Sequence, residues 1–326
     1  MLSNEFRQFR GTRADHVAVQ EEESLRGHRG FRSFAGDQSG LGEIEHIAQL
    51  PGAGLAGGPN DGQIDGALEI LDGTHLFEIE CRRIHSLLFL PPFFDKGKRY
   101  PIVAFPHGGP NSMSKDAYST RWNSHFLAAP GYVVIETDYS GSTGFGEKFA
   151  DDVERDVLRG PAGEILEAIE EAARRFAYID KSRQAAVGAS YGGYLMNWFN
   201  GHTRQFRCLV NHAGAMNNES QYGANDGGFD RELRMGGPVW EKGGQWNDQS
   251  PIRYAGAFRT PMLITQGELD YRVPLNESMT TFKLLQRLRV PVRLVTFPDE
   301  GHWVLKGENS RKHMEEVMGW LKRYLD

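Results

Sequence analysis

From residue 76 onward, short apolar runs alternate with longer stretches whose apolar residues recur at helical spacing. The apolar runs predict strands buried on both faces of a sheet, at 83–90, 101–106, 132–138, 184–189, 206–213, 261–267 and 292–298. The helical spacing predicts helices at 116–130, 163–176, 194–200, 280–288 and 310–325. In the last of these, one face holds Met314, Val317, Met318, Leu321 and Leu325. Strands that alternate with helices predict an α/β fold with a mostly parallel central sheet and helices on both faces.

Residues 1–75 have a different character. They are rich in Gly and Arg, as in PGAGLAGGPNDGQIDG at 51–66, and they show little strand or helix periodicity. This composition is typical of weakly ordered chain, and a remnant of a larger N-terminal domain fits it equally well. We therefore predict two parts, an N-terminal segment over 1–75 and a folded domain over 76–326.

Composition narrows the functional classes. The chain has 326 residues and a formal net charge of −6, a balance that favours neither nucleic acid nor an anionic membrane as a partner. Only two cysteines, Cys81 and Cys208, argue against a disulfide framework and against a cysteine-rich metal site. No apolar stretch reaches the ~20 residues of a membrane span, and residues 1–16 lack the apolar core of a signal peptide. We expect a cytoplasmic protein that uses no metal and no cofactor.

A Gly-x-Ser-x-Gly motif gives the first sign of chemistry. In GASYGGY (188–194), Ser190 follows a predicted buried strand directly and opens the next helix. A sharp strand-to-helix turn of this kind exposes the serine hydroxyl above the sheet. A hydroxyl is a weak nucleophile at neutral pH, so it needs a base, and the base needs an orienting acid.

The acid and the base follow in the expected order along the chain. Asp270 lies in the loop after the strand at 261–267, and His302 lies in the loop after the strand at 292–298. Each candidate therefore stands just past the carboxyl end of a strand, as Ser190 does, and the three together predict a catalytic triad. Rival acids are Glu268, Asp299 and Glu300, of which only Glu268 is far enough from His302 in sequence to compete.

Two backbone N–H groups are candidates for an oxyanion hole. The first belongs to Tyr191, the residue after the predicted nucleophile. The second belongs to Gly109 in FPHGGP (105–110), where glycines follow an early strand and let N–H groups face a ligand. An insertion at 213–246 carries several aromatic residues, of which we predict that Tyr222 and Phe229 line a substrate pocket.

Together these segments resemble the catalytic domain of the prolyl oligopeptidase family of serine peptidases, especially its acylaminoacyl-peptidase and dipeptidyl-peptidase branches. The resemblance spans about residues 72 to 326. Its motifs are LDGTHL, FLPPFFDKGKRYPIVAFPHGGP, GYVVIETDYSGSTGFG, GASYGGY, GELDYRVP and PDEGHWV. It implies an α/β-hydrolase fold over 76–326 and cleavage of peptide bonds by Ser190, Asp270 and His302, with Gly109 and Tyr191 at the oxyanion hole.

Two features depart from the family pattern. Family members normally carry a large β-propeller ahead of the hydrolase domain, and residues 1–75 are too short for one. The face that a propeller covers would then be exposed, which favours a homo-oligomer. In addition, the family segment Asn-x-Arg-Gly-Ser reads DYSGS here, with Asp138 and Ser140 in place of Asn and Arg. An arginine-mediated contact is therefore lost from this loop.

Three functions remain open from the sequence. The first is a serine peptidase that acts on short peptides through an acyl-enzyme. The second is a carboxylesterase with the same triad, because an acyl-enzyme mechanism cleaves activated esters more readily than amides. The third is a non-catalytic fragment or binding module, against which the complete triad argues.

Overall fold

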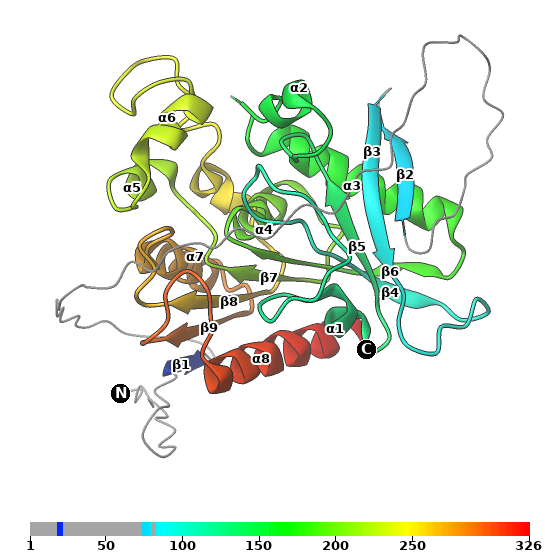
Figure 1. Cartoon of the computed structure of the whole chain (residues 1–326). Coiled ribbons are helices and arrows are strands. Elements are labelled where there is room, and N and C mark those ends of the chain that lie inside the picture. The colour runs from blue at the N-terminus through cyan, green and yellow to red at the C-terminus, as the bar shows by residue number, and fades with distance from the viewer. Residues whose placement is uncertain (1–17, 22–73, 80–81, 155) are drawn as a thin grey trace, which may run out of the picture. The chain divides into compact units, whose positions relative to one another are not determined.

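The computed structural model describes residues 18–21, 74–79, 82–154 and 156–326 (Figure 1). Within these residues, nine strands form one sheet in the order β1-β9-β8-β7-β6-β4-β5-β3-β2. The strands are β1 (Ala18–Glu21), β2 (Thr74–Ile79), β3 (Arg82–Phe89), β4 (Tyr100–Ala104), β5 (Val133–Asp138), β6 (Ile179–Ala189), β7 (Cys208–His212), β8 (Met262–Gly267) and β9 (Val292–Phe297). The helices are α1 (Ser124–Ala128), α2 (Glu147–Asp151), α3 (Arg159–Arg175), α4 (Tyr191–His202), α5 (Asn218–Tyr222), α6 (Gly228–Met235), α7 (Leu275–Arg287), α8 (Gly307–Leu325) and the 3₁₀ helix η1 (Pro251–Ala257).

The centre of the sheet is parallel and its edges are antiparallel. Strands β5, β4, β6, β7, β8 and β9 pair in parallel, with Val187 opposite Val210 and Ile264 opposite Leu294 in the register. Strands β3 and β1 pair antiparallel with β5 and β9. The carboxyl ends of the parallel strands therefore meet at one edge of the sheet, where ligands bind in open α/β sheets.

Helices cover both faces of the sheet (Figure 1). On one face, Ile165 of α3, Leu195 of α4 and Leu285 of α7 join the same buried cluster. On the other face, α1 and α8 pack with Leu127, Val317 and Leu321 in a second cluster. This arrangement confirms the predicted α/β class and its two helical layers. The predicted apolar face of α8 packs on the sheet as expected, with Met314 and Met318 partly buried at its margin.

The helix predicted over 116–130 is shorter than expected. Only Ser124–Ala128 is helical, and residues 116–123 form an irregular loop. The helix begins there because the Asn123 side chain accepts a hydrogen bond from the N–H of Phe126, at 3.1 Å. An asparagine cap of this kind satisfies a free N–H at the first turn, so it marks a helix start inside a segment that periodicity alone would extend.

The N-terminal segment is described only in part. Ala18–Glu21 forms β1 at the edge of the sheet, and β2 begins at Thr74. The rest of 1–75, with the prediction that it is weakly ordered or a remnant, lies outside the described residues. The boundary between residues 75 and 76 stays a prediction.

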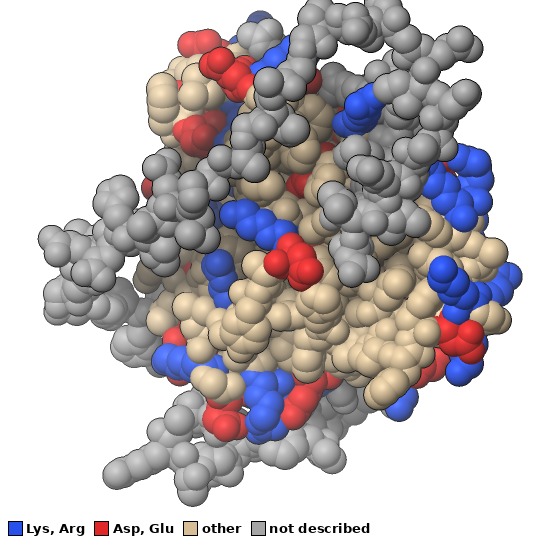
Figure 2. Space-filling view, turned by 45° about the vertical axis from the view of Figure 1, so that its right-hand side comes forward, with Lys and Arg blue, Asp and Glu red and all other residues tan. Residues whose placement is uncertain are grey.

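Charge is mixed on the face drawn in Figure 2. Basic and acidic side chains lie interspersed, toward its edges and also next to each other near its middle, and a broad area of uncharged side chains lies below them. The described residues on this face thus form no extended patch of one sign. Within the described ranges, no helix is both long enough and apolar enough to cross a membrane.

Candidate active site

Ser190 stands on a strained turn between β6 and α4. Its backbone has φ 60° and ψ −118°, a combination of dihedral angles that residues other than Gly rarely adopt. The turn is tight enough to require glycine on both sides. A Cβ on Gly188 would lie 2.3 Å from the Gly192 carbonyl oxygen, and one on Gly192 would lie 2.6 Å from that of Pro106. The chain therefore holds Ser190 in the sharp strand-to-helix turn that the sequence predicts.

The structure brings Ser190, His302 and Asp270 together in one hydrogen-bonded chain. The Ser190 Oγ lies 2.9 Å from His302 Nε2, and His302 Nδ1 lies 2.7 Å from Asp270 Oδ2. The His302 side chain is 16 % exposed and the Asp270 side chain is fully buried, so the chain runs from an accessible hydroxyl to a protected carboxylate. The order and the distances are those of a nucleophile, a base and an orienting acid.

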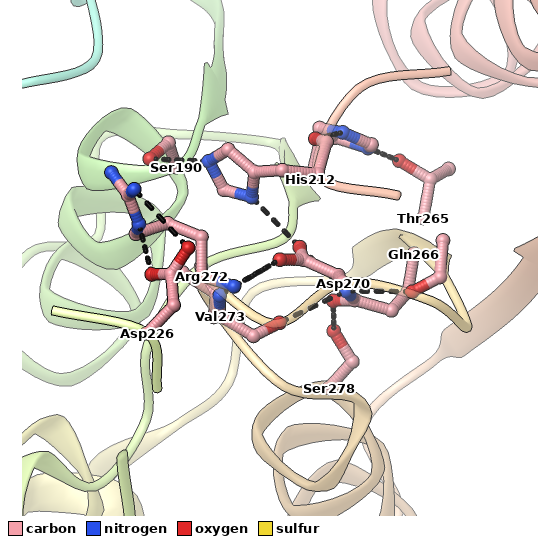
Figure 3. Close-up of polar contacts among 12 residues, drawn as sticks. Ser190, His212, Asp226, Thr265, Gln266, Asp270, Arg272, Val273 and Ser278 are labelled. Carbon is pink, nitrogen blue, oxygen red and sulfur yellow. Dashed lines mark hydrogen bonds and ion pairs between the residues drawn. The ribbon is translucent and has the colours of Figure 1, made fainter. Parts of the chain in front are cut away.

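Asp270 accepts hydrogen bonds on both of its carboxylate oxygens. The backbone N–H groups of Arg272 and Val273 donate to Oδ1, at 2.8 and 2.9 Å. The Gln266 amide donates to Oδ2 at 3.0 Å, and its own oxygen accepts from Ser278 Oγ at 2.7 Å (Figure 3). Because every donor points at the charged form, the site holds Asp270 in one orientation toward His302.

The rival acids lie elsewhere. Glu268 accepts a hydrogen bond from Thr296 Oγ1 at 2.8 Å. Asp299 pairs with Lys306, and Glu300 accepts from the N–H groups of Leu305 and Lys306. Among the described residues, none of these three carboxylates bonds to His302, so the geometry favours Asp270.

The glycine loop after β4 passes close to the nucleophile. A Cβ on Gly108 would lie 3.4 Å from the Ser190 Cβ, so this loop borders the nucleophile directly. Within the described part of the chain, the N–H groups of Tyr191 and Gly109 donate to no other group. The Tyr191 side chain is buried and donates its hydroxyl to the Val157 carbonyl, so only its backbone is available at the site.

A relay of buried, hydrogen-bonded side chains contacts the backbone carbonyl of His302. His212 Nε2 lies 3.1 Å from the His302 carbonyl oxygen, and His212 Nδ1 lies 2.9 Å from Thr265 Oγ1. Thr265 Oγ1 in turn lies 3.1 Å from His313 Nε2. A carbonyl oxygen only accepts, so His212 carries its proton on Nε2, and Nδ1 accepts from the Thr265 hydroxyl. The Thr265 oxygen then accepts from His313, which fixes every proton in the relay.

Burial lowers the pKa of His212 to about 4, since the charged imidazole is poorly solvated there. An exposed histidine in the unfolded chain has a pKa near 6.5. Between these two values the unfolded state binds more protons than the native state, so acidification destabilises the native fold. Above pH 6.5 the ring is neutral in both states and its titration adds nothing. As the pH falls from 6.5 toward 4, we expect His212 to lower the free energy of unfolding by up to about 3 kcal/mol.

The test is urea unfolding of wild type and His212→Gln at pH 7, 6, 5 and 4. We expect the stability difference between the two proteins to shrink on acidification, with wild type losing more. Glu136, whose pKa is raised to about 7 by burial, is common to both proteins and cancels in the difference. A difference that stays constant over this range would contradict the assignment of a neutral, buried His212.

The insertion places its aromatic residues in different environments. Tyr222 is half-buried, donates its hydroxyl to Glu232 Oε1 at 2.6 Å and packs against Trp246. Phe229 lies on the outer side of α6 and is 74 % exposed. The predicted pocket role of these two residues stays a prediction.

Several residues of the site were not predicted from sequence. Gln266 and Thr265 on β8 and His212 on β7 are polar residues inside mostly apolar strands, and this interruption of the apolar run is the signal that could have found them.

An ion pair between Arg272 and Asp226 also lies near the triad, with 2.5 Å between Nε and Oδ1 (Figure 3). Nothing in the local pattern of either residue predicts this pairing.

Comparisons with known proteins agree with this geometry. Residues 118–326 match the model of the prolyl oligopeptidase family. A dipeptidyl-peptidase 5 of Schizosaccharomyces pombe is 36 % identical over 254 residues, which are 77 % of this chain and 36 % of that protein. The dipeptidyl-peptidase 5 of Arthroderma otae is 36 % identical over 287 residues, which are 86 % of this chain and 37 % of that protein. The chain thus spans little more than a third of the length of these relatives.

Solved structures give the same result. An acylaminoacyl peptidase of Pyrococcus horikoshii superposes with a TM-score of 0.70 and 26 % identity, covering 77 % of this chain and 41 % of that one. A puromycin-hydrolyzing peptidase of Mycobacterium tuberculosis, at 23 % identity and a TM-score of 0.69, shares the fold over 77 % of this chain and 39 % of its own. The fold, the family match and the arrangement around Ser190 lead to one conclusion: the chain belongs to the prolyl oligopeptidase family.

Proposed function

We propose that this chain is a serine peptidase that hydrolyses short peptides through an acyl-enzyme on Ser190. The observation that carries the proposal is the continuous hydrogen-bonded chain from Ser190 through His302 to Asp270. Two kinds of relative add support, since those compared above bear the names dipeptidyl-peptidase 5 and acylaminoacyl peptidase.

In the proposed reaction, His302 Nε2 accepts the Ser190 proton as Oγ attacks the carbonyl carbon of the scissile bond. Asp270 holds the proton of His302 on Nδ1, so that Nε2 is free to accept, and stabilises the imidazolium that forms. His302 then donates the proton to the leaving amine, and the acyl group remains on Ser190. A water molecule repeats the attack on the ester with the same proton transfers, which releases the acid and restores Ser190.

The negative charge on the carbonyl oxygen in the transition state would be stabilised by the N–H groups of Tyr191 and Gly109. Both donors come from backbone that is fixed by the fold, and neither is used by another acceptor in the described residues. A preorganised donor of this kind contributes about 3 to 4 kcal/mol to transition-state stabilisation.

Side-by-side kinetics test the proposal. The substrates are a set of acyl-amino-acid and X-Pro p-nitroanilides and a short-chain p-nitrophenyl ester, with Ser190→Ala as the control protein. We expect wild type to cleave anilides and Ser190→Ala to lose that activity. Ester cleavage alone would replace the proposed peptidase with an esterase, and no turnover of either class by wild type would reject catalysis by Ser190.

A further inference from the structure

Helix α6 has an inverted arrangement of polar and apolar side chains. Phe229 and Leu233 lie on its solvent side, 74 % and 57 % exposed. The opposite side carries Arg231 and Met235, one turn apart, and Met235 is 1 % exposed in the core. A surface helix normally turns its apolar residues inward and its charges outward. An inward arginine beside exposed apolar residues therefore calls for a functional explanation.

Among the residues that the structure describes, no acidic group contacts the Arg231 guanidinium directly. Arg231 makes no hydrogen bond and no ion pair with any described residue. The residue is half-buried and keeps contact with solvent, and the desolvation that accompanies this partial burial lowers its pKa. The Arg231 guanidinium is thus partly shielded by protein and still reaches solvent. Arginine stays protonated at neutral pH, so the site carries a full positive charge.

The nearest acidic groups are already engaged. Glu277 attracts Arg231 only at longer range, since its Oε2 accepts from the N–H groups of Met216 and Asn217, at 2.8 and 2.7 Å. Asp230 contacts Arg234 instead, at 3.1 Å, and its side chain is 68 % exposed. A partly desolvated charge that has no partner among the described residues favours a ligand of opposite charge.

Arg234 adds a second incomplete donor. Its Nη2 donates to Asn111 Oδ1 at 2.8 Å, which ties α6 to the loop that carries Gly109. Its Nη1 is buried and has no acceptor among the described residues. Two guanidinium charges on neighbouring turns of one helix suit a carboxylate, which carries a negative charge on two oxygens.

The contact of Arg234 with Asn111 lies two residues from Gly109, and Arg231 lies one turn away on the same helix. The rings of Tyr139, Tyr191 and Tyr194 form a row with centroid spacings of 5.7 and 6.1 Å. Burial raises the pKa of each tyrosine, and Arg234 opposes that rise at Tyr139 and Tyr191, as Arg231 does at Tyr194. Both guanidinium groups therefore act electrostatically on the tyrosines at and beside the first turn of α4.

We propose that Arg231 and Arg234 form a subsite that binds a carboxylate of the peptide substrate and so select acidic substrates. This inference depends on the proposed peptidase function and adds its specificity. Two sources share the chemistry: an Asp or Glu side chain on the acyl side of the scissile bond, or the free carboxyl terminus of the leaving part. Arg272 is not assigned to this subsite because Asp226 accepts from both its Nε and its Nη2, which occupies the two-donor edge of that guanidinium.

The test compares substrates that differ only in charge. The acyl-side pair is N-acetyl-Glu and N-acetyl-Gln p-nitroanilide, and the leaving-side pair is N-acetyl-Phe-Ala-Ala with a free or an amidated carboxyl terminus. We expect wild type to favour the charged member of one pair by about 10- to 100-fold in kcat/KM, the range of a charge-assisted hydrogen bond. Arg231→Gln is expected to bring that ratio close to one, and Arg231→Lys to restore part of it. A ratio within one protein is independent of the folded fraction.

The control variant is Arg311→Gln, which removes an exposed arginine of α8 and is expected to keep the wild-type ratio. Binding gives a second readout that needs no turnover. In Ser190→Ala, titration calorimetry compares N-acetyl-glutamate with N-acetyl-glutamine, and Ala-Ala with Ala-Ala amide. We expect the charged member of one pair to bind about 10-fold or more tightly, and Arg231→Gln to remove the difference.

The outcomes separate the two proposals. Turnover without any charge preference, or a preference that survives Arg231→Gln, would overturn the carboxylate subsite and leave the peptidase. A binding preference without turnover by wild type would reject the peptidase and support the subsite. No turnover and no binding preference would overturn both.

Discussion

Replacement of Ser190 by alanine is expected to lower kcat for peptide anilides about 10⁶-fold, with the fold intact. Alanine lacks the Oγ that forms the acyl-enzyme, while the N–H groups of Tyr191 and Gly109 remain in place. The strained backbone at φ 60° is as costly for alanine as for serine, so stability is expected to change little. Steady-state kinetics and thermal unfolding measure the two effects separately.

A variant that keeps its melting temperature and still cleaves anilides at more than about a hundredth of the wild-type rate would remove Ser190 from the mechanism. That result would direct attention to another nucleophile. A variant that fails to fold would be replaced by Ser190→Gly, which relieves the backbone strain and also lacks the hydroxyl.

The second large effect is expected from Asp270→Asn, a loss of about 10⁴-fold in kcat. The backbone N–H groups of Arg272 and Val273 need an acceptor, so the asparagine oxygen stays on their side. Its NH₂ group then faces His302 Nδ1 and donates to it. His302 is forced to carry its proton on Nε2, and Nε2 no longer accepts the proton of Ser190.

The matched control is Glu268→Gln, which removes a carboxylate from the same loop without touching His302. We expect this variant to keep kcat within about threefold of wild type, in line with ordinary surface substitutions. If Glu268→Gln lost as much activity as Asp270→Asn, the assignment of the acid would be wrong. The comparison decides between the two acids that the sequence leaves open.

The fold and the placement of the triad could be predicted because both follow from short-range signals. Continuous apolar runs identify the central strands, and each candidate lies directly after one of them: Ser190 after β6, Asp270 after β8 and His302 after β9. Since the carboxyl ends of parallel strands meet at one edge, order along the chain is enough to bring the three side chains together.

The rest depends on contacts between distant segments. The Gln266 contact with Ser278 and the His212 contact with the His302 carbonyl join residues whose local patterns do not reveal a partner. Helix α6 departs from the usual arrangement of a surface helix, because its arginines face the protein while Phe229 and Leu233 face solvent. The predicted helix at 116–130 fails for a local reason, the cap at Asn123, which periodicity does not register.

The structure also gives a physical reason for the sequence DYSGS at 138–142, which differs from the family segment Asn-x-Arg-Gly-Ser. Asp138 is fully buried and accepts from His85 Nδ1 at 2.6 Å and from the Ser114 N–H at 2.6 Å. His85 lies directly opposite Asp138 in the register of β3 and β5. Ser140 donates through its N–H and its hydroxyl to Glu164, both at 2.6 Å. Partners on β3 and α3 thus accommodate the two residues that replace Asn and Arg.

The most direct test of the central claim is covalent trapping of the nucleophile. Wild type is incubated with an N-acylated aminoalkyl phosphonate diphenyl ester, which reacts with activated serines, and the adduct is located by peptide mass spectrometry. The triad geometry predicts one adduct per chain, on Ser190, and its loss in His302→Ala. An adduct on another residue, or no adduct on folded wild-type protein, would contradict the assignment of Ser190 as the activated nucleophile.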